Sequence, residues 1–378
     1  MYHVKTMNKI SKIGLAELDD RFAISDTMEH EDAILVRSAK LHDYDFPAEL
    51  KCIARAGAGV NNIPLDRAAD AGIVVFNAPG ANANGVKELT IAALLLASRK
   101  ISQGITWVKE QSAAGADVAA VVEKGKAAYV GPEIMGKTLG VVGLGAIGVL
   151  VANAAAALGM KIVGYDPFLS VTHALNLTPG VEVVDTLPEL YAKADYISLH
   201  LPMNDATRGT LNEAAFAAMK DGVRIVNLAR GELVDTPAMK AALASGKCAA
   251  YVTDFPNSET AAMEGVVAIP HLGASTPESE DNCAMMAARE VKEYLDNGSI
   301  INSVNLPNLT MAWAAKTRVC VISKGADAAA IAGAVPAVAS ASNTRGEYAY
   351  TILDTDAAVD EAAIAAIPGV LRVRVLTR

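Results

Sequence analysis

Cysteine is scarce in this chain of 378 residues, and its four cysteines lie far from one another. Cys52, Cys248, Cys283 and Cys320 form no C-x-x-C pair, and none has the spacing to a histidine that is typical of zinc ligands. This distribution gives no support for a disulfide framework or for a metal site. We therefore expect four buried free thiols and no metal.

Clusters of lysine and arginine are absent as well. The formal net charge at pH 7 is −9, which argues against nucleic acid or an anionic membrane as a partner. The N-terminal segment MYHVKTMNKI lacks the apolar core of a signal peptide, so we expect a cytoplasmic protein. The uncharged stretch 138–160 contains glycines and an asparagine, which favours a soluble strand and helix over a membrane span. A small-molecule substrate is the expected partner.

The most informative segment is 139–166, LGVVGLGAIGVLVANAAAALGMKIVGYD. An apolar strand precedes Gly143, Gly145 and Gly148 at the spacing G-x-G-x-x-G, and an alanine-rich helix then leads to a strand that ends in Asp166. The first glycine permits a tight turn, the second lets phosphates approach, and the third lets helix and strand pack closely. The first amides of the helix then bind the pyrophosphate. Asp166 favours NAD over NADP, because a carboxylate accepts hydrogen bonds from the ribose and repels a 2′-phosphate.

The remaining segments predict two further domains, and an apolar fraction of 52% is ample for their cores. Short apolar runs before the glycine motif indicate a small α/β domain. Polar side chains stand at the carboxyl ends of these runs: Arg37, Ser38, Arg55 and Asn77. Open parallel sheets bind ligands at that edge. Beyond Met311 the pattern indicates β-α-β-β-α-β, which is the order of ferredoxin-like domains.

The predicted fold class is therefore α/β. It comprises two doubly wound parallel-sheet domains, Rossmann-like or flavodoxin-like, and a small C-terminal α+β domain of ferredoxin-like order. We expect the first domain to contain residues 1–88 and 290–312, the nucleotide-binding domain residues 89–289, and the C-terminal domain residues 317–378.

Three polar side chains of the nucleotide-binding domain are not expected in a hydrophobic core, namely Arg230, Glu259 and His271. Arg230 follows an apolar strand, where a guanidinium can bind a carboxylate in fork geometry; otherwise it is a surface arginine in a turn. His271 follows another apolar strand, where an imidazole can take a hydroxyl proton, although a lone histidine is more often structural. A carboxylate from Asp254 or Glu259 would orient that imidazole. Together these residues indicate acid–base chemistry beside a nucleotide.

Several phrases of the chain resemble a known enzyme family. LVRSA, ARAGAGVNNIPLDRAADAGIVVFNAPGANANGVKEL, GKTLGVVGLGAIG, GYDP, VNLARGELVD and IPHLGAST are together similar to the D-isomer-specific 2-hydroxyacid dehydrogenases. The resemblance implies that Arg230 and His271 are catalytic, that Glu259 supports the histidine, and that Asp254 lies on the nicotinamide side. The family commonly reads D-V-F-x-x-E-P where this chain reads DFPNSET, which keeps Asp254 open as the functional carboxylate.

The resemblance also implies NAD as the cofactor. The residues that it assigns to NAD binding are Gly143, Gly145, Ala146, Ile147, Gly148, Asp166, His200, Leu201, Pro202, Ala229, Arg230, Asp254, His271 and Gly273. The family often has arginine where this chain has Ala146, so one side-chain contact to the pyrophosphate is expected to be missing. His200 is interpreted as structural or adjacent to the cofactor.

For the substrate, the resemblance implies one site for a phosphate and one for a carboxylate. The phosphate is assigned to Arg37 and Ser38 with help from Arg55, and the carboxylate to the backbone of the turn from Gly57 to Gly59. Ala56 is also counted among the substrate-binding residues. Arg230 and His271 complete the substrate-binding set. Arg37 and Arg230 lie in different predicted domains, so a substrate with both groups would bridge them. An ion pair at a strand end is the alternative reading of Arg37.

The implied reaction is oxidation of 3-phospho-D-glycerate to 3-phosphohydroxypyruvate, the entry step of serine biosynthesis. A glyoxylate or hydroxypyruvate reductase is the nearest alternative, since it shares the catalytic residues, and an NAD-sensing binding protein is a more distant one. The C-terminal domain resembles the ACT regulatory module, but its first loop, ISKGADAAA, lacks the His-x-Asn and Pro-Gly features of effector sites. We therefore expect it to serve assembly of a homodimer or homotetramer.

Overall fold

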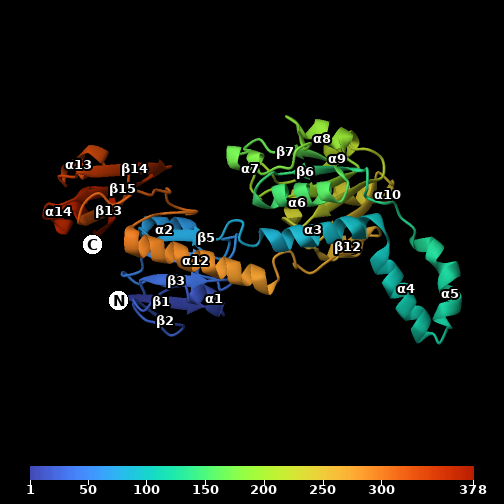
Figure 1. Ribbon diagram of the computed structural model, residues 1–378, viewed down its shortest axis with the longest axis horizontal. Helices are drawn as coiled ribbons and strands as arrows, with labels where there is room; N and C mark the ends of the chain where they lie inside the picture. Colours follow the sequence, from blue (N-terminus) through green and yellow to red (C-terminus); the bar gives the residue numbers. More distant parts are fainter. The chain divides into compact units, whose positions relative to one another are not determined.

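The computed structural model describes all residues, 1–378, and they form two compact units (Figure 1). The first unit consists of Met1–Asn82 and Pro277–Arg378, and the second of Ala83–Thr276. The boundaries thus fall at 82/83 and 276/277, whereas we expected 88/89 and 289/290. They lie there because helix α3 (Ala83–Ser98) packs on strands of the second unit, and helix α12 (Pro277–Asn297) packs on strands of the first.

The first unit contains a five-stranded parallel sheet in the order β2-β1-β3-β4-β5. This is the flavodoxin-like order, and it confirms the predicted parallel-sheet class. The strands are β1 Tyr2–Met7, β2 Phe22–Ser25, β3 Ala33–Val36, β4 Cys52–Arg55 and β5 Val74–Asn77. Helices α1 (Lys12–Leu15) and α2 (Leu65–Asp70) accompany α12. Gly14 of α1 lies so close to α12 that a Cβ there would come within 2.4 Å of the Cβ of Ala284.

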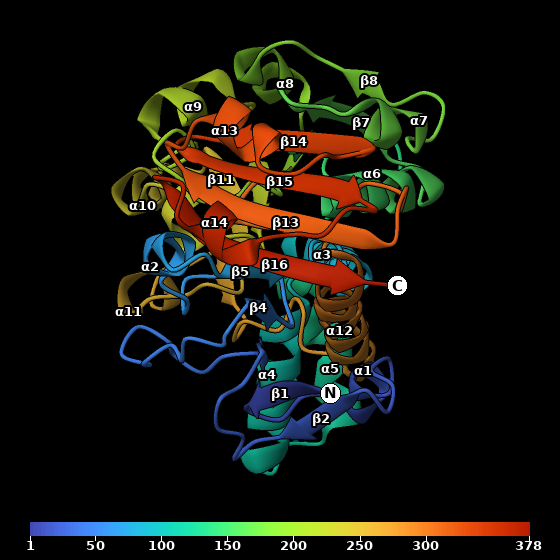
Figure 2. The ribbon, with the colours of Figure 1, turned by 90° about the vertical axis from the view of Figure 1, so that its left-hand side faces the viewer.

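After α12 the chain forms a four-stranded antiparallel sheet in the order β14-β15-β13-β16 (Figure 2). Its elements are β13 Thr317–Lys324, α13 Ala328–Gly333, β14 Ala339–Arg345, β15 Tyr348–Thr355, α14 Glu361–Ala365 and β16 Val370–Thr377. The observed order of strands and helices is the β-α-β-β-α-β that the sequence predicts. We refer to residues 317–378 as the C-terminal module. Strand β14 lies at the sheet edge, and most of its side chains are exposed.

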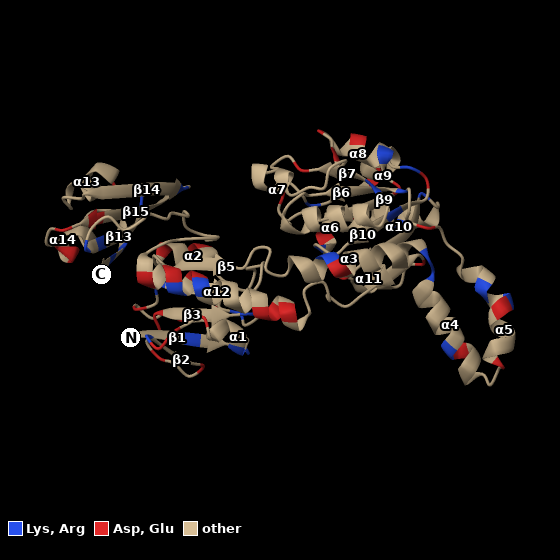
Figure 3. Ribbon diagram, in the orientation of Figure 1, with Lys and Arg blue, Asp and Glu red and all other residues tan.

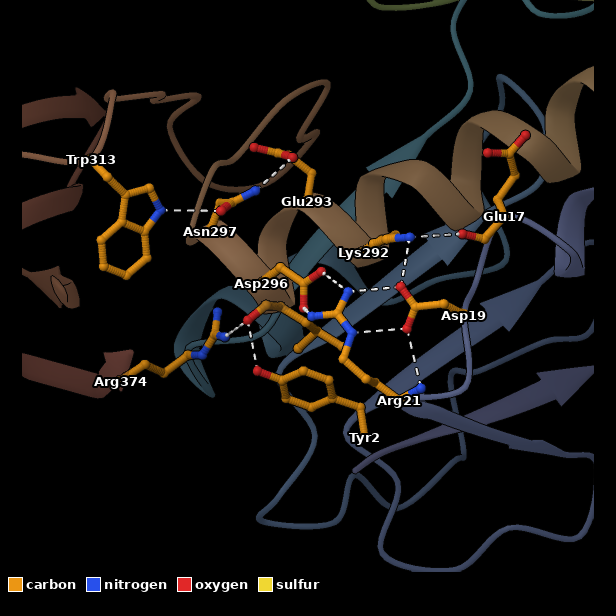
Figure 4. Close-up of polar contacts among 11 residues, drawn as sticks. Tyr2, Glu17, Asp19, Arg21, Lys292, Glu293, Asp296, Asn297, Trp313 and Arg374 are labelled. Atoms are coloured by element: carbon orange, nitrogen blue, oxygen red, sulfur yellow. Dashed lines mark hydrogen bonds and ion pairs between the residues drawn. The ribbon is translucent and has the colours of Figure 1, made fainter. Parts of the chain in front are cut away.

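Two arginines attach the C-terminal module to the end of α12, and Figure 4 shows one of them, Arg374. A helix leaves its last carbonyls unpaired, and its C-terminus carries a partial negative charge. Arg374 of β16 donates to the carbonyls of residues 294 and 295 at 3.0 and 2.9 Å, and Arg318 of β13 donates to that of Asn297 at 2.9 Å. Arg318 is also paired with Asp354 through two buried hydrogen bonds. The arginines thereby satisfy the helix end and fix the module to it.

The second unit is built on seven parallel strands in the order β12-β11-β10-β9-β6-β7-β8, which confirms the predicted Rossmann-like sheet. The strands are β6 Thr138–Val142, β7 Lys161–Tyr165, β8 Glu182–Val183, β9 Tyr196–Leu199, β10 Val223–Asn227, β11 Cys248–Thr253 and β12 Val266–Ala268. The helices beside α3 are α6 Ala146–Ala157, α7 Val171–Leu175, α8 Leu187–Lys193, α9 Glu213–Ala218, α10 Thr236–Ala244 and α11 Ser258–Ala261, with a 3₁₀ turn η2 at Gly231–Leu233.

A helical arm extends from the second unit beyond α3 (Figure 1). It consists of α4 (Ile101–Ala113), α5 (Val118–Gly125) and the 3₁₀ turn η1 (Lys126–Tyr129), and none of these contains a buried residue. Apolar side chains on α4 are exposed, among them Ile101 and Ile105. We refer to residues 101–129 as the arm.

Two expectations from composition can be compared directly with the structure. All four cysteines are buried free thiols, as predicted. No helix combines the length and the apolar character that crossing a membrane requires.

One buried carboxyl group in α12 makes stability depend on pH. Glu290 is 5% exposed; its Oε1 accepts a hydrogen bond from Asn302 at 2.7 Å, and its Oε2 has no partner. Burial raises the pKa of Glu290 from 4.5 to about 8. Between these two values the folded protein holds a proton that the unfolded chain has lost, so the free energy of unfolding decreases as pH rises.

We predict that Glu290→Gln flattens this pH dependence, because the amide stays neutral and keeps the oxygen that Asn302 contacts. The expected gain in stability over wild type is roughly a few kcal/mol at alkaline pH and close to zero below about pH 5. Urea unfolding of both proteins at several pH values measures it. Parallel stability curves for the two proteins would contradict the assignment.

Candidate active site

One register row crosses the sheet of the second unit and aligns the ends of its strands. Successive Cα partners in this row, from β7 to β12, are Tyr165, Val142, Leu199, Asn227, Thr253 and Ala268. All these strands are parallel, so the segments that follow them leave the sheet at one edge. The strand order reverses between β6 and β9, and open parallel sheets bind ligands at such a point. The predicted site residues of this unit follow this row.

The glycine loop has the geometry that each glycine requires. Gly143 has φ +95°, and a Cβ there would lie 2.7 Å from the carbonyl oxygen of His200. A Cβ at Gly148 would lie 1.9 Å from the carbonyl oxygen of Gly143, so only glycine lets α6 pack on the loop. A Cβ at Gly145 would meet no atom within 4 Å. Gly145 precedes α6, whose first residues are Ala146 and Ile147, so open space lies where a phosphate would approach the helix amides.

Asp166 follows β7 and is tied to the same loop. Its Oδ2 accepts a hydrogen bond from the amide of Leu144 at 2.9 Å, and its Oδ1 accepts one from that of Phe168 at 2.8 Å. The carboxylate remains partly exposed, and carboxylate oxygens accept more than one hydrogen bond. Asp166 therefore fits the role of a ribose partner while it also holds the loop in place.

His200 follows β9 and is followed in turn by Leu201 and Pro202. Its Nε2 lies 2.9 Å from the Oγ of Ser198. Burial lowers the pKa of His200 from 6.5 to about 4, so the ring is neutral at physiological pH. A neutral ring bonded to its own strand fits the structural interpretation.

Arg230 is held by the turn that follows β10. Buried Asn227 accepts a hydrogen bond from the amide of Ala229 at 3.1 Å and donates one to the carbonyl of Arg230 at 2.8 Å. The guanidinium donates to the carbonyl of Ala229 at 2.6 Å, and its Cζ lies 5.3 Å from the centre of the Phe255 ring. Arg230 is therefore a half-buried cation whose guanidinium is hydrogen-bonded to a backbone carbonyl.

Asp254 follows β11 and is 1% exposed. Its Oδ2 accepts a hydrogen bond from the amide of Gly273 at 3.0 Å, and its Oδ1 has no partner. Burial raises the pKa of Asp254, while the charges of His271 and Arg230 oppose that rise. A buried oxygen without a partner is costly, which indicates that a donor from a ligand belongs there.

Glu259 lies in the short helix α11, whose start is closed by a capping box from Asn257 and Thr260. Its Oε1 is 3.4 Å from the Nζ of Lys240, and about half of its side chain is exposed. The structure thus brings Asp254 into the electrostatic environment of His271 and pairs Glu259 with a lysine of α10.

His271 lies in the loop after β12. Its amide donates to the carbonyl of Asp254 at 3.0 Å, and its carbonyl accepts a hydrogen bond from Ser275. Its imidazole makes no hydrogen bond, and its ring centre is 4.4 Å from that of Phe255. Asp254 therefore sets the position of the main chain of His271, whereas Phe255 contacts its ring.

In the first unit, the predicted phosphate residues follow a second register row, in which Val36, Arg55 and Asn77 are Cα partners. Arg37 directly follows β3, and its Nη2 lies 2.5 Å from the Oε1 of Glu280. Glu280 belongs to the acidic first turn of α12 (Figure 3). The ion pair that the sequence left open as an alternative for Arg37 is thus present, and a phosphate would compete with Glu280 for the guanidinium.

The neighbouring backbone is ordered by hydrogen bonds. Asn8 accepts from the amide of Ser38 at 3.0 Å, and Arg55 donates from Nε to the carbonyl of Arg37 at 3.1 Å. The amide of Ala56 donates to Val36. Gly57 has φ +152°, and a Cβ there would lie 2.3 Å from Nη1 of Arg55. The turn at 56–57 and the arginine of β4 therefore form one packed group.

Three residues that contact predicted site residues were not predicted from the sequence: Asn227 and Phe255 in the second unit, and Glu280 in the first. Asn227 had a local signal, because a polar residue at the end of a buried strand needs partners. Phe255 and Glu280 had none, since each acts through a contact between segments that are distant in sequence.

Comparison with known proteins identifies the second unit. Residues 91–273 match the family model described as D-isomer specific 2-hydroxyacid dehydrogenase, NAD binding domain. The match identifies NAD as the cofactor, and the glycine loop, α6 and Asp166 fit it.

Two curated relatives are D-3-phosphoglycerate dehydrogenases. The chain is 35% identical over 315 residues to the D-3-phosphoglycerate dehydrogenase of Methanocaldococcus jannaschii, covering 81% of this chain and 58% of that protein. It is 36% identical over 329 residues to that of Bacillus subtilis, covering 82% and 60%. The chain thus spans a little over half the length of these relatives.

Solved structures match as well. A glyoxylate reductase from Paecilomyes thermophila has a TM-score of 0.66 and 27% identity, covering 80% of this chain and 98% of that one. The NAD⁺-bound 3-phosphoglycerate dehydrogenase in Entamoeba histolytica has a TM-score of 0.61 and 26% identity, covering 82% and 99%.

The glycine loop yields a matched pair of predictions. Gly145→Ala should fold normally, because its methyl group meets no protein atom, but it should weaken NADH binding at least about tenfold by filling the phosphate approach. Gly148→Ala should lower the thermal unfolding midpoint, because its Cβ would overlap the Gly143 carbonyl. Fluorescence titration with NADH and calorimetry separate the two effects. Wild-type NADH affinity in Gly145→Ala would refute the assignment of this space.

Proposed function

We propose that the chain is a D-isomer-specific 2-hydroxyacid dehydrogenase and that it oxidises 3-phospho-D-glycerate to 3-phosphohydroxypyruvate with NAD. The observation that carries this proposal is the cluster of Arg230, Asp254 and His271 at the sheet edge that bears the glycine loop. The names of the relatives support the choice of substrate.

The cluster supplies the groups that such an oxidation needs. The imidazole of His271 takes the proton of the C2 hydroxyl as the C–H bond at C2 breaks. NAD, when bound, supplies the acceptor for the hydride that leaves C2. The guanidinium of Arg230 binds the substrate carboxylate and the C2 oxygen, and it stabilises negative charge on that oxygen. In the reverse direction, His271 returns the proton.

A carboxylate beside the imidazole stabilises the charge that His271 gains. The family pattern assigns this role to Glu259, and the observed contacts favour Asp254. The Asp254 carboxylate is buried and interacts electrostatically with both His271 and Arg230, whereas Glu259 is exposed and paired with Lys240. We therefore propose Asp254 as the main electrostatic partner of His271.

Replacing each carboxylate by its amide distinguishes the two. Asp254→Asn should lower kcat/KM about a hundredfold or more, because a buried negative charge beside the acid–base residue is lost. Glu259→Gln should stay within about threefold of wild type, because only an exposed ion pair is lost. Steady-state kinetics with NADH affinity as a control measures both. A larger loss in Glu259→Gln would return the role to Glu259.

We propose that Arg37, with Ser38 and Arg55, holds the phosphate of the substrate. The pairing of Arg37 with Glu280 also supports a second candidate, a dehydrogenase or reductase for small 2-hydroxy or 2-oxo acids without a phosphate. In that case the ion pair would stay closed, and the similarity to a glyoxylate reductase would reflect the substrate.

Variants of the ion pair distinguish these candidates. NADH formation from 3-phospho-D-glycerate and from D-glycerate is followed at alkaline pH with hydrazine as a trap. Arg37→Met should raise KM for the phosphorylated acid about 10- to 100-fold and leave D-glycerate unaffected, because one charged contact to the phosphate is lost. Glu280→Gln should lower KM for the phosphorylated acid, because the competitor of the phosphate is gone. Equal effects on both acids, or a wild-type preference for D-glycerate, would favour the second candidate.

We further propose that the protein forms a homodimer or homotetramer and that the C-terminal module is of ACT type and serves assembly. Two features support this proposal. The arm carries exposed apolar side chains on a helix pair without buried residues, which is typical of a protein interface. Edge strand β14 leaves backbone groups unpaired, as strands that pair with another chain do.

A further inference from the structure

Phe255 contacts both groups to which the proposed mechanism assigns the chemistry. The Cζ of Arg230 is 5.3 Å from the centre of its ring, and the ring of His271 is centred 4.4 Å from it. The planes of the Phe255 and His271 rings are inclined by 45°. One half-buried phenyl group thus contacts both side chains.

The main chain around Phe255 holds this ring in place. Its amide donates to the Oγ1 of Thr253 at 3.1 Å, and the preceding residue, Asp254, is almost fully buried. A Cβ at Gly231 would lie 3.3 Å from the carbonyl oxygen of Phe255 and 3.5 Å from its Cβ. The turn after β10 therefore packs closely on the loop after β11. This packing holds the main chain that carries the phenyl ring in place.

Neither of its two neighbours is hydrogen-bonded to another side chain. The imidazole of His271 has no hydrogen-bond partner, and the guanidinium of Arg230 donates only to the carbonyl of Ala229. An aromatic face attracts a guanidinium and an imidazolium, and aromatic rings prefer defined mutual inclinations. Both functional side chains therefore share one aromatic neighbour, the ring of Phe255.

We propose that Phe255 is a positioning residue, which orients Arg230 toward the carboxylate and C2 oxygen of the substrate and His271 toward its hydroxyl proton. The proposal rests on the function proposed above. It assigns to an aromatic ring the orienting role that a hydrogen-bonded carboxylate has in many acid–base pairs.

Phe255→Leu tests this role, because leucine keeps an apolar side chain and removes the aromatic face. We expect kcat for 3-phospho-D-glycerate to fall at least about tenfold, since small misplacements of reacting groups slow chemistry strongly. The Kd for NADH should change less than about threefold. The deuterium isotope effect on kcat with substrate labelled at C2 should increase, because the chemical step becomes slower than product release. Phe255→Tyr, which keeps the aromatic face, should restore most of kcat.

The chain offers a matched control in Phe46, a half-buried phenyl group under the guanidinium of Arg67, whose Cζ is 4.3 Å from the ring centre. Phe46→Leu makes the same chemical change away from the cluster, and its kcat and isotope effect should equal those of wild type. Should Phe255→Leu fail to bind NADH, Phe255→Met provides the comparison with a more adaptable apolar side chain.

Three outcomes would overturn the inference. Wild-type kcat and isotope effect in Phe255→Leu would show that the ring orients nothing. A loss of kcat that Phe255→Tyr fails to restore would assign the ring to packing alone. A wild-type protein that oxidises no 2-hydroxy acid would refute the proposed function and this inference together, whereas an active wild type with an unaffected Phe255→Leu would refute the inference only.

Discussion

The geometry of the second unit depends on the register of its parallel strands, which aligns residues of neighbouring strands in a row across the sheet. Asn227, Thr253 and Ala268 are aligned across β10, β11 and β12, and Val142 and Leu199 continue the row across β6 and β9. A shift of one strand would turn its side chains to the other face of the sheet. This alignment brings four segments to one edge of the sheet. They are the glycine loop, the turn of Arg230, Asp254 and the loop of His271.

Within that frame, each functional group is placed by a different kind of contact. Asn227 shapes the turn of Arg230 through two hydrogen bonds, and the carbonyl and carboxylate of Asp254 bind the amides of His271 and Gly273. The ring of Phe255 then contacts the side chains of Arg230 and His271. The first unit has a parallel sheet edge as well, and there Arg37 is paired with Glu280.

The sequence predicts those parts of the structure that depend on local sterics and on hydrophobic patterning. The roles of the glycines at 143, 145 and 148 can be predicted from the sequence, because they follow from where a Cβ would clash or leave space. The order of the C-terminal module follows from its apolar runs. By contrast, the pairing of Glu259 with Lys240, of Arg37 with Glu280 and of Phe255 with His271 joins residues from separate elements. Such contacts depend on loop lengths and helix positions, which patterning does not encode.

The central claim is that the protein moves a hydride between C2 of a D-2-hydroxy acid and NAD. Incubation with 3-phospho-D-glycerate deuterated at C2, followed by mass spectrometry of the reduced nucleotide, tests it most directly. The account predicts one deuterium in the nicotinamide ring of the NADH that forms, and no such NADH from a His271→Ala variant. Reduced nucleotide without deuterium, or none from the wild-type protein, would contradict it.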